Sequence, residues 1–507
     1  MIRFLSVSLV CFVASVFAVV FAEEGNTTVK LPFGSDPNVT SVSFESVPQP
    51  LNFAGVHEIC VTVSIDRPEA VGAVPLAIHN VNGWHQVHFH RGIVQKPGRQ
   101  QLIYPSPWDF SQVDQIRLTF YRNEGVDATV KVLGWELRAI TERHFSELPP
   151  QPDEFRFAYA RVGNMEWVGG IPISGLVPGD WDRTMAELKK TGFHAVVPLL
   201  RYGEAHYDSK FWPHSEVFEK HGDQLQQAVQ AGKKHGIEVH VWVANFYLHR
   251  VPKELTDAMQ QAGRMQVYFD GTVDKHLLCP THPENRKLEC DSMVEIVKNY
   301  DVAGVSFDYV RFGGDEYTGG PSLCYCDGCR ERFEKSVGEK ITDWPRATRS
   351  AQWSKKFNDW RREQITALVV DVQREAKKVK PSAKISAAVF PVESKNLVLQ
   401  DWPLWVEKGY LDFVTVMIYD RSDQQFDMMV EHAMEVMKNS GGKTPVYPIM
   451  ASTRYDNLTL DQMRTQMMIV RGHGAPGFGV FHVDEEAIKT TLPFLNFGSP
   501  RENVPAP

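Results

Sequence analysis

The most informative segment is Ala303-Gly304-Val305-Ser306-Phe307-Asp308-Tyr309-Val310-Arg311-Phe312, because a run of small and apolar residues ends in an acid, a phenol and a guanidinium. A strand that is covered on both faces has room for a carboxylate only at its open end. In a parallel β/α barrel the carboxyl ends of the strands form the active-site face. We therefore expect Asp308 to point toward whatever the barrel binds.

Strands and amphipathic helices alternate on both sides of this stretch. Strands are predicted at 155–162, 195–200, 238–244, 302–310, 384–390, 413–418, 446–450 and 478–482. Helices are predicted at 181–190, 224–234, 289–300, 351–378, 403–408, 426–438 and 460–471. Eight such units predict an α/β fold, a (β/α)8 TIM barrel over residues 153–495. A doubly wound open sheet has the same local pattern, but no Gly-rich dinucleotide loop follows the first strand.

Residues 30–145 have a different pattern, with short strands and no helical periodicity. Strands are predicted at 58–65, 74–79, 86–90, 115–121 and 129–137. Such a row of strands favours an all-β sandwich, jelly-roll-like and weakly similar to carbohydrate-binding modules. The linker Leu148-Pro149-Pro150-Gln151-Pro152 separates this domain from the barrel.

The N-terminal 22 residues have the order of an export signal. Arg3 precedes an apolar run at 4–20, and Val20-Phe21-Ala22 supplies small residues before a cleavage point after Ala22. A membrane anchor is the alternative, but the run is short for a spanning helix. We therefore predict a signal peptide at 1–22 and a secreted protein, periplasmic or extracellular, without a membrane span after signal removal.

The composition narrows the class of partner. Lys and Arg number 54 against 62 Asp and Glu, so the net charge is −8, and no basic block is suited to binding phosphates. This balance argues against nucleic acid as a partner. With 43% hydrophobic and 11% aromatic residues among 507, the chain can form sizeable cores.

Polar side chains follow most of the predicted barrel strands. The acids Asp308, Asp420 and Glu393 are the candidate catalytic residues, because cleavage of a glycosidic bond generally needs two carboxylates. Asp308 is paired with Asp420 first and with Glu393 as the alternative. Capping of the next helix explains any single acid equally well, but it does not explain why polar side chains follow most of the barrel strands. The candidate substrate-binding residues are Arg161, Arg201, Glu204, Asn245, Tyr309, Arg311, Tyr419 and His482.

Three of these strand segments carry a family resemblance over about residues 155–490. The strand end Phe307-Asp308-Tyr309-Val310-Arg311-Phe312, the run Val239-His240-Val241-Trp242 and the run Val414-Thr415-Val416-Met417-Ile418-Tyr419-Asp420 resemble the family-ten-like glycosyl hydrolases, bacterial TIM-barrel proteins associated with cell-wall or other glycans. The resemblance implies a glycoside hydrolase that cleaves a polysaccharide or cell-wall glycan with a carboxylate pair. Those relatives often have a second acid directly after the strand-four aspartate, where this chain has Tyr309.

Two other functions stay open. A non-catalytic glycan-binding protein on the same scaffold is the first, with Asp308 serving as a structural ion pair to Arg311. A metal-dependent hydrolase is less well supported, because no HExxH or His-x-His pair lies at a strand end of the barrel.

Six cysteines remain after the predicted leader, and three of them lie in Cys324-Tyr325-Cys326-Asp327-Gly328-Cys329. Thiolates this close in sequence can converge on one tetrahedral cation. Cys279, which follows the third strand, is the expected fourth ligand, and the set is similar to the four-cysteine zinc site of barrel β-galactosidases. We predict a structural zinc ion and no organic cofactor, with disulfides as the alternative in an exported protein.

Overall fold

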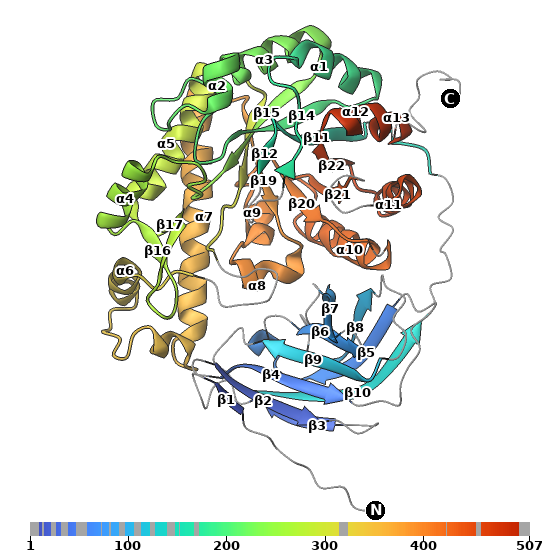
Figure 1. Cartoon of the computed structure of the whole chain (residues 1–507), viewed down its shortest axis with the longest axis vertical. Helices are drawn as coiled ribbons and strands as arrows, with labels where there is room; N and C mark the ends of the chain where they lie inside the picture. Colours follow the sequence, from blue (N-terminus) through green and yellow to red (C-terminus); the bar gives the residue numbers. More distant parts are fainter. Residues whose placement is uncertain are drawn as a thin grey trace, which may run out of the picture.

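The computed structural model of the chain describes residues 10–12, 15–21, 27–31, 39–46, 58–71, 74–80, 83–90, 97–105, 113–121, 127–138, 148–151, 153–166, 172–313, 323–421, 423–452 and 458–495. It contains an N-terminal pair of β-sheets followed by a β/α barrel (Figure 1).

The barrel is closed by eight parallel strands. In order around the barrel they are β11 (Phe155–Arg161), β14 (Ala195–Arg201), β15 (Glu238–Ala244), β18 (Gly304–Asp308), β19 (Lys384–Val389), β20 (Phe413–Ile418), β21 (Val446–Ala451) and β22 (Gly477–Val483). β22 pairs with β11, which closes the ring. This topology confirms the predicted TIM barrel and excludes the open doubly wound sheet.

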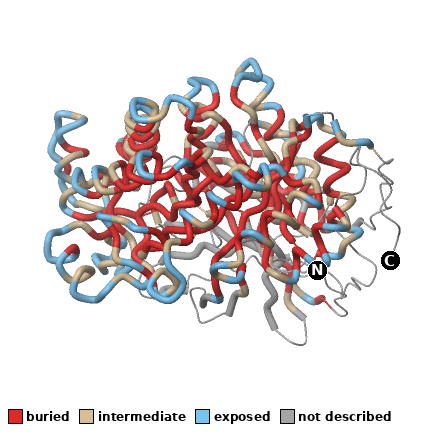
Figure 2. The backbone as a smooth tube through the Cα atoms, turned by 90° about the horizontal axis from the view of Figure 1, so that it is seen from above, coloured by how far each residue is buried: buried red, intermediate tan, exposed pale blue. Residues whose placement is uncertain are grey.

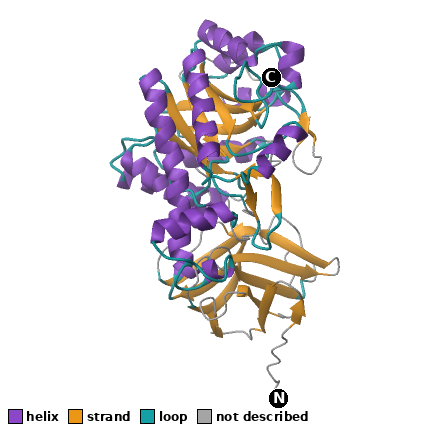
Figure 3. Cartoon of the chain, turned by 90° about the vertical axis from the view of Figure 1, so that its left-hand side faces the viewer, coloured by secondary structure: helices purple, strands orange, loops and turns teal. Residues whose placement is uncertain are grey.

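Helices surround the strands (Figure 3). The longer ones are α1 (Trp181–Lys190), α3 (Gln224–His235), α4 (Lys253–Gln261), α5 (Pro283–Asn299), α6 (Asp327–Val337), α7 (Ser354–Val379), α10 (Asp423–Asn439) and α11 (Leu460–Gly472). The shorter ones are α2 (Glu216–His221), α8 (Lys395–Val398), α9 (Trp402–Lys408), α12 (Glu485–Thr490), α13 (Leu492–Leu495), and the 3-10 turns η1 (Pro68–Ala70), η2 (Arg346–Arg349) and η3 (Val392–Ser394).

Local sequence explains where these elements begin and end. Every residue of β14 is buried, as expected for an apolar strand covered on both faces. α3 begins after Asp223, whose side chain accepts from the Gln226 amide, and ends at Gly236, whose φ of 67° is the left-handed cap that glycine provides. Buried residues lie mostly in the interior of the molecule and exposed ones at its periphery, as the red and pale blue segments of Figure 2 show.

The N-terminal strands form two sheets that share one core. The six-stranded sheet has the order β1 (Val10–Phe12), β2 (Ser15–Phe21), β4 (Val39–Ser46), β9 (Gln115–Tyr121), β6 (Val74–Asn80) and β7 (Gly83–His90). The four-stranded sheet has the order β3 (Thr27–Leu31), β10 (Ala128–Arg138), β5 (Glu58–Ile65) and β8 (Gly98–Pro105). Apolar residues of both sheets join one buried cluster, which is the packing of a sandwich. β1 and β2 lie inside the predicted leader, whose cleavage stays a prediction.

Two loops at the carboxyl ends of the strands hold additional elements. The loop after β15 contains α4 and a hairpin of β16 (Met265–Val267) and β17 (Val273–Leu278), and the loop after β18 contains α6. A short pair, β12 (Met165–Glu166) and β13 (Pro172–Ile173), follows β11. Within the described ranges, no helix is both long and apolar enough to cross a membrane.

Candidate active site at the carboxyl ends of the strands

Asp308 is the last residue of β18, at the end of the barrel where the strand carboxyl ends meet. It lies in register with Ala244, and its carbonyl oxygen accepts a hydrogen bond from the Asn245 amide at 2.8 Å. Its exposed fraction is 6%. The carboxyl is therefore fixed by the sheet at the expected strand end and is largely removed from water.

Three donors approach the carboxylate of Asp308. Oδ2 accepts from Trp242 Nε1 at 3.0 Å, and Oδ1 accepts from the Tyr309 amide at 2.6 Å. The Arg311 Nη1 atom lies 3.5 Å from the same Oδ1. Burial raises the pKa of Asp308 above its ordinary value, while the Arg311 charge and the hydrogen bonds oppose that rise. The expected contact between Asp308 and Arg311 is thus present.

Aromatic rings from several strands pack beside this carboxyl. The Trp242 ring lies edge-on to Tyr159 at 5.4 Å between centroids and 5.8 Å from Phe481. Tyr419 stacks on Phe481 at 5.0 Å, and the Arg161 guanidinium lies 5.3 Å from the centre of the Phe481 ring. The structure therefore brings Tyr419 and the fully buried Arg161, which is 0% exposed, to one aromatic wall.

Tyr309 belongs to a second aromatic group, which we call the tyrosine cluster and define as Tyr202, Tyr247 and Tyr309. Tyr202 and Tyr247 stack at 4.9 Å, and Tyr247 lies 5.2 Å from Tyr309. The exposed His276 of β17 stacks on Tyr247 at 6.5 Å. Tyr309 has a φ of 54°, a strained value for a tyrosine, and such outliers concentrate at functional sites. Tyr247 and His276 were missed in the sequence, although Tyr247 lies two residues from the predicted Asn245.

Arg201 and Asn245 lie buried in the wall of the barrel, and their predicted role in substrate binding stays a prediction. Both are 0% exposed. Arg201 forms an ion pair with the fully buried Glu289, whose Oε2 also accepts from Asn245 Nδ2 at 2.8 Å. Glu289 accepts a further bond from the Phe246 amide at 2.7 Å. A buried charge needs such partners, so these residues support the strand ends from within the wall.

Glu204 lies in the turn after β14, and its side chain is 15% exposed. Arg250 Nη1 lies 3.9 Å from its carboxylate. Burial raises the pKa of Glu204 to about 7, because the attraction of Arg250 only partly offsets the lost hydration. Glu204 therefore titrates near neutrality, as a proton donor requires.

The two predicted partners of Asp308 follow neighbouring strands. Asp420 follows β20, is 9% exposed, and accepts a bond at its carbonyl oxygen from Gln466 Nε2 at 2.8 Å. The backbone of Glu393 lies in η3 after β19, and its side chain lies outside the described residues. Asp423, at the start of α10, was not singled out in the sequence, and burial raises its pKa to about 6.

His482 and Asp484 lie at the carboxyl end of β22, the last strand of the barrel. His482 is 3% exposed, and its Nε2 lies 3.3 Å from the Ser174 carbonyl oxygen. Asp484 caps α12 by accepting from the Ala487 amide at 2.8 Å. Helix capping therefore accounts for this acid, as expected for an aspartate at the positive end of a helix.

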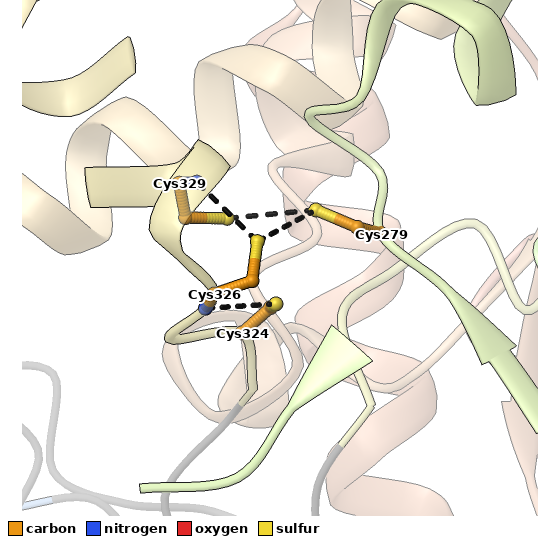
Figure 4. A group of neighbouring side chains, drawn as sticks. All are labelled: Cys279, Cys324, Cys326 and Cys329. Atoms are coloured by element: carbon orange, nitrogen blue, oxygen red, sulfur yellow. Dashed lines mark hydrogen bonds between the residues drawn. The ribbon is translucent and has the colours of Figure 1, made fainter. Parts of the chain in front are cut away.

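The four predicted cysteine ligands lie together (Figure 4). The sulfur atoms of Cys279, Cys324, Cys326 and Cys329 all lie within 4.8 Å of one another, and all four residues are buried. Cys279 Sγ lies 3.8 Å from Cys326 Sγ and 3.5 Å from Cys329 Sγ. No sulfur pair among the described residues forms a disulfide. The disulfide alternative is therefore not what the structure shows.

The surroundings of the four sulfurs fit a metal ion. Tetrahedral thiolates at about 2.3 Å from zinc are separated from one another by about 3.8 Å, close to the spacing here. Amide groups donate to two of the sulfurs, from Val267 to Cys324 at 3.1 Å and from Cys329 to Cys326 at 3.3 Å. Such bonds stabilise thiolate charge. Four protein ligands would complete the coordination, so this buried cluster could hold a metal ion in a structural role.

A closed barrel with a buried carboxyl and aromatic walls at its strand ends defines a glycosidase-type β/α barrel. Residues 160–447, more than half of the chain, match the family Glycosyl hydrolase-like 10, and the chain belongs to this family. This match confirms the resemblance predicted from the strand ends.

Among curated relatives, the chain is 24% identical over 290 residues to glycosyl hydrolase DigH of Escherichia coli K12, covering 50% of this chain and 61% of the relative. It is 21% identical over 295 residues to glycosyl hydrolase YngK of Bacillus subtilis 168, covering 51% and 52% respectively. The matched region thus spans only about half to three-fifths of these relatives.

Similar solved structures include barrel glycosidases. The β-galactosidase of Rahnella sp. R3 aligns with a TM-score of 0.48 at 13% identity, over 69% of this chain and 56% of that chain. An α-L-fucosidase of Paenibacillus thiaminolyticus aligns with a TM-score of 0.46 at 11% identity, over 68% and 49%.

Proposed function

We propose that the protein is a glycoside hydrolase that acts on a polysaccharide or cell-wall glycan through Asp308. The observation that carries the proposal is the buried carboxyl at the end of β18, held by the Trp242 indole and the Tyr309 amide. In this role the ionised carboxylate attacks the anomeric carbon or activates water there, and a second carboxyl protonates the leaving oxygen. Tyr309, the ring of the tyrosine cluster that is not buried, has a polar edge and an apolar face that suit sugar stacking.

The second carboxyl is Asp420, Glu393 or Glu204. Asp420 and Glu393 follow from their strand positions, and the pKa of about 7 at Glu204 supports it as a proton donor. Asn or Gln variants of the three can be compared on two substrates, the natural glycan and an aryl glycoside whose leaving group needs no protonation. The proton donor is the residue whose variant loses the first activity and keeps the second.

A screen of purified protein on polysaccharides and peptidoglycan, measuring new reducing ends, tests the proposal. We expect one glycan class to be cleaved. A protein that binds a glycan with saturable affinity but releases no reducing ends from it would contradict catalysis.

That outcome would favour a glycan-binding protein on the same barrel. The observation that favours this second function is that both oxygens of Asp308 already have protein donors, with Arg311 3.5 Å away. A carboxylate held in this way can serve structure instead of chemistry.

We propose further that the four cysteines hold structural zinc. Sulfur ligands in a closed tetrahedral set are typical of zinc, although Fe–S chemistry uses similar ligands. Metal analysis should give one zinc per chain. Substoichiometric zinc together with an absence of free thiols would contradict it.

We also propose that residues 1–22 direct export and are removed. Sequencing the N-terminus of the protein recovered outside the cytoplasm should begin at Glu23. A retained Met1 in that fraction would contradict cleavage.

A further inference from the structure

We propose that a cavity between the β16–β17 hairpin and the start of α6 is a second sugar-binding site, taking an uncharged sugar unit of the glycan that enters the barrel. This inference rests on the proposed function, because the same glycan would contact both sites. The cavity has a volume of about 450 Å³. The hairpin and α6 lie side by side in Figure 1.

Aromatic side chains line this cavity and are held by hydrogen bonds. Tyr268 is 40% exposed, and its hydroxyl donates to Asp274 Oδ2 at 2.8 Å. Trp344 Nε1 donates to the Tyr325 carbonyl oxygen at 2.9 Å. The ring of Tyr325 in turn lies edge-on to Phe269, at 5.2 Å between centroids. Fixed aromatic faces lose little conformational entropy when a ligand stacks on them.

The polar groups of the cavity specify an uncharged ligand with hydroxyls. Gln260 and Asp327 are exposed at the cavity and offer an amide and a carboxylate. Asp327 is the one charged side chain among the lining residues that the structure describes. An anion would meet this charge, and no cation is among the described lining residues, because the Arg349 guanidinium is stacked on the Phe269 ring at 3.3 Å. A sugar ring, with an apolar face and hydroxyl edges, fits both the aromatic rings and the neutral polar groups.

One hairpin borders both places, because Val273 of β17 lines the cavity and His276 of β17 stacks on Tyr247 of the tyrosine cluster. Its walls come from the loops after β15 and β18, the strands that carry Asn245 and Asp308 at their ends. The far end of the hairpin is fixed to the barrel, because the Leu248 amide donates to the His276 carbonyl oxygen at 2.8 Å. The six residues of β17 span about 17 Å at a strand rise of about 3.4 Å per residue. A glycan that leaves the tyrosine cluster can therefore follow the hairpin to the cavity.

Calorimetric titration of the full chain tests this site. The Asp308→Asn background prevents cleavage, and the probes are cellohexaose and chitohexaose with their disaccharides. Tyr268→Ala should weaken binding of the hexasaccharide by about fivefold or more, the value of one aromatic stacking contact. It should leave disaccharide affinity at the barrel unchanged. Tyr268→Phe, which keeps the ring, should restore binding.

Phe211→Ala is the matched control, because Phe211 is also an exposed aromatic, at 38%, outside this cavity. Equal hexasaccharide affinity in the Tyr268→Ala and Phe211→Ala variants would overturn the second site and leave the proposed function intact. Absence of hexasaccharide binding in every variant would also overturn it, whereas the proposed function is judged separately by reducing-end release from wild type.

Discussion

At the scale of single residues, Asp308 combines burial with stabilising donors, and the two act on its charge in opposite directions. Burial raises its pKa, while Arg311, the Tyr309 amide and the Trp242 indole favour the ionised form. The position of the residue was predictable, because an apolar strand covered on both faces can accommodate a carboxylate only at its open end. The donor from β15 was not predictable, because a tryptophan in a strand normally indicates core.

The first prediction concerns Arg311. Because its positive charge lowers the pKa of Asp308, Arg311→Gln should raise that pKa further. If ionised Asp308 is needed, the acid limb of the pH profile of kcat/KM must then move to higher pH. Arg286→Gln, which removes a guanidinium bound to Asp371, is the control and should leave the limb in place. A limb that does not move in Arg311→Gln would contradict this account of the site.

At the scale of elements, the strands followed from sequence and the loop insertions did not. β15 and β20 have the predicted bounds, because their apolar residues leave no other pattern. β17 was missed because Val273–Leu278 is largely unburied, with one buried residue of six, and carries charges, so neither alternation nor an apolar run is visible. Helix α5 was predicted to begin six residues late, and Glu289 therefore did not emerge as the partner of Arg201.

The cysteine cluster connects these insertions, which leads to the second prediction. Cys279 follows the hairpin and Cys329 lies in α6, so a bound ion would hold both loops together. Cys329→Ser should release zinc and lower the free energy of unfolding by several kcal/mol, about as much as other structural zinc sites contribute. Cys290→Ser is the control, because it also places a serine hydroxyl at a buried cysteine position, outside the cluster. It should lower the free energy of unfolding by about 1 kcal/mol. Equal losses of stability in the two variants, with zinc retained in both, would contradict a metal role.

The third prediction concerns β15 at the opposite end of the barrel. The hydrogen bond to His240, with Lys384, lowers the pKa of Glu238 to about 2. A lowered pKa stabilises the fold above the ordinary value of 4.5, and this stability is lost as the pH falls toward 2. Glu238→Gln should therefore lower the free energy of unfolding by about 1 kcal/mol near neutral pH, a value reduced because the Glu238 side chain is partly exposed. The cost should shrink as the pH is lowered, and a pH-independent cost in denaturant titrations would contradict the linkage.

At the scale of the whole molecule, a β-sandwich precedes a glycosidase-type barrel. Periodicity predicted the barrel because eight buried parallel strands alternating with helices form either a closed barrel or an open sheet that helices cover on both faces. In the sandwich, β3, β4 and β8 were missed, although the alternation Val42-Ser43-Phe44 in β4 is typical of a strand. The partner of Asp308 could not be chosen from sequence, since chain order gives strand positions and not side-chain directions.

The fourth prediction concerns the predicted leader. If residues 1–22 are removed on export, the mature chain must fold without the pairing of β2 with β4. A chain that begins at Glu23 should therefore fold with the same thermal midpoint as the full chain, as differential scanning calorimetry would measure. A mature chain that fails to fold would show that the sandwich needs β2, which pairs with β4.

Catalysis by Asp308 is tested by the rate at which Asp308→Asn releases reducing ends from the glycan that wild type cleaves. We predict a loss of about 10²–10⁴-fold in kcat with an unchanged thermal midpoint. Asp182→Asn, at an exposed aspartate of α1, should retain full activity. An Asp308→Asn protein with wild-type turnover would contradict the assignment of this carboxyl to catalysis.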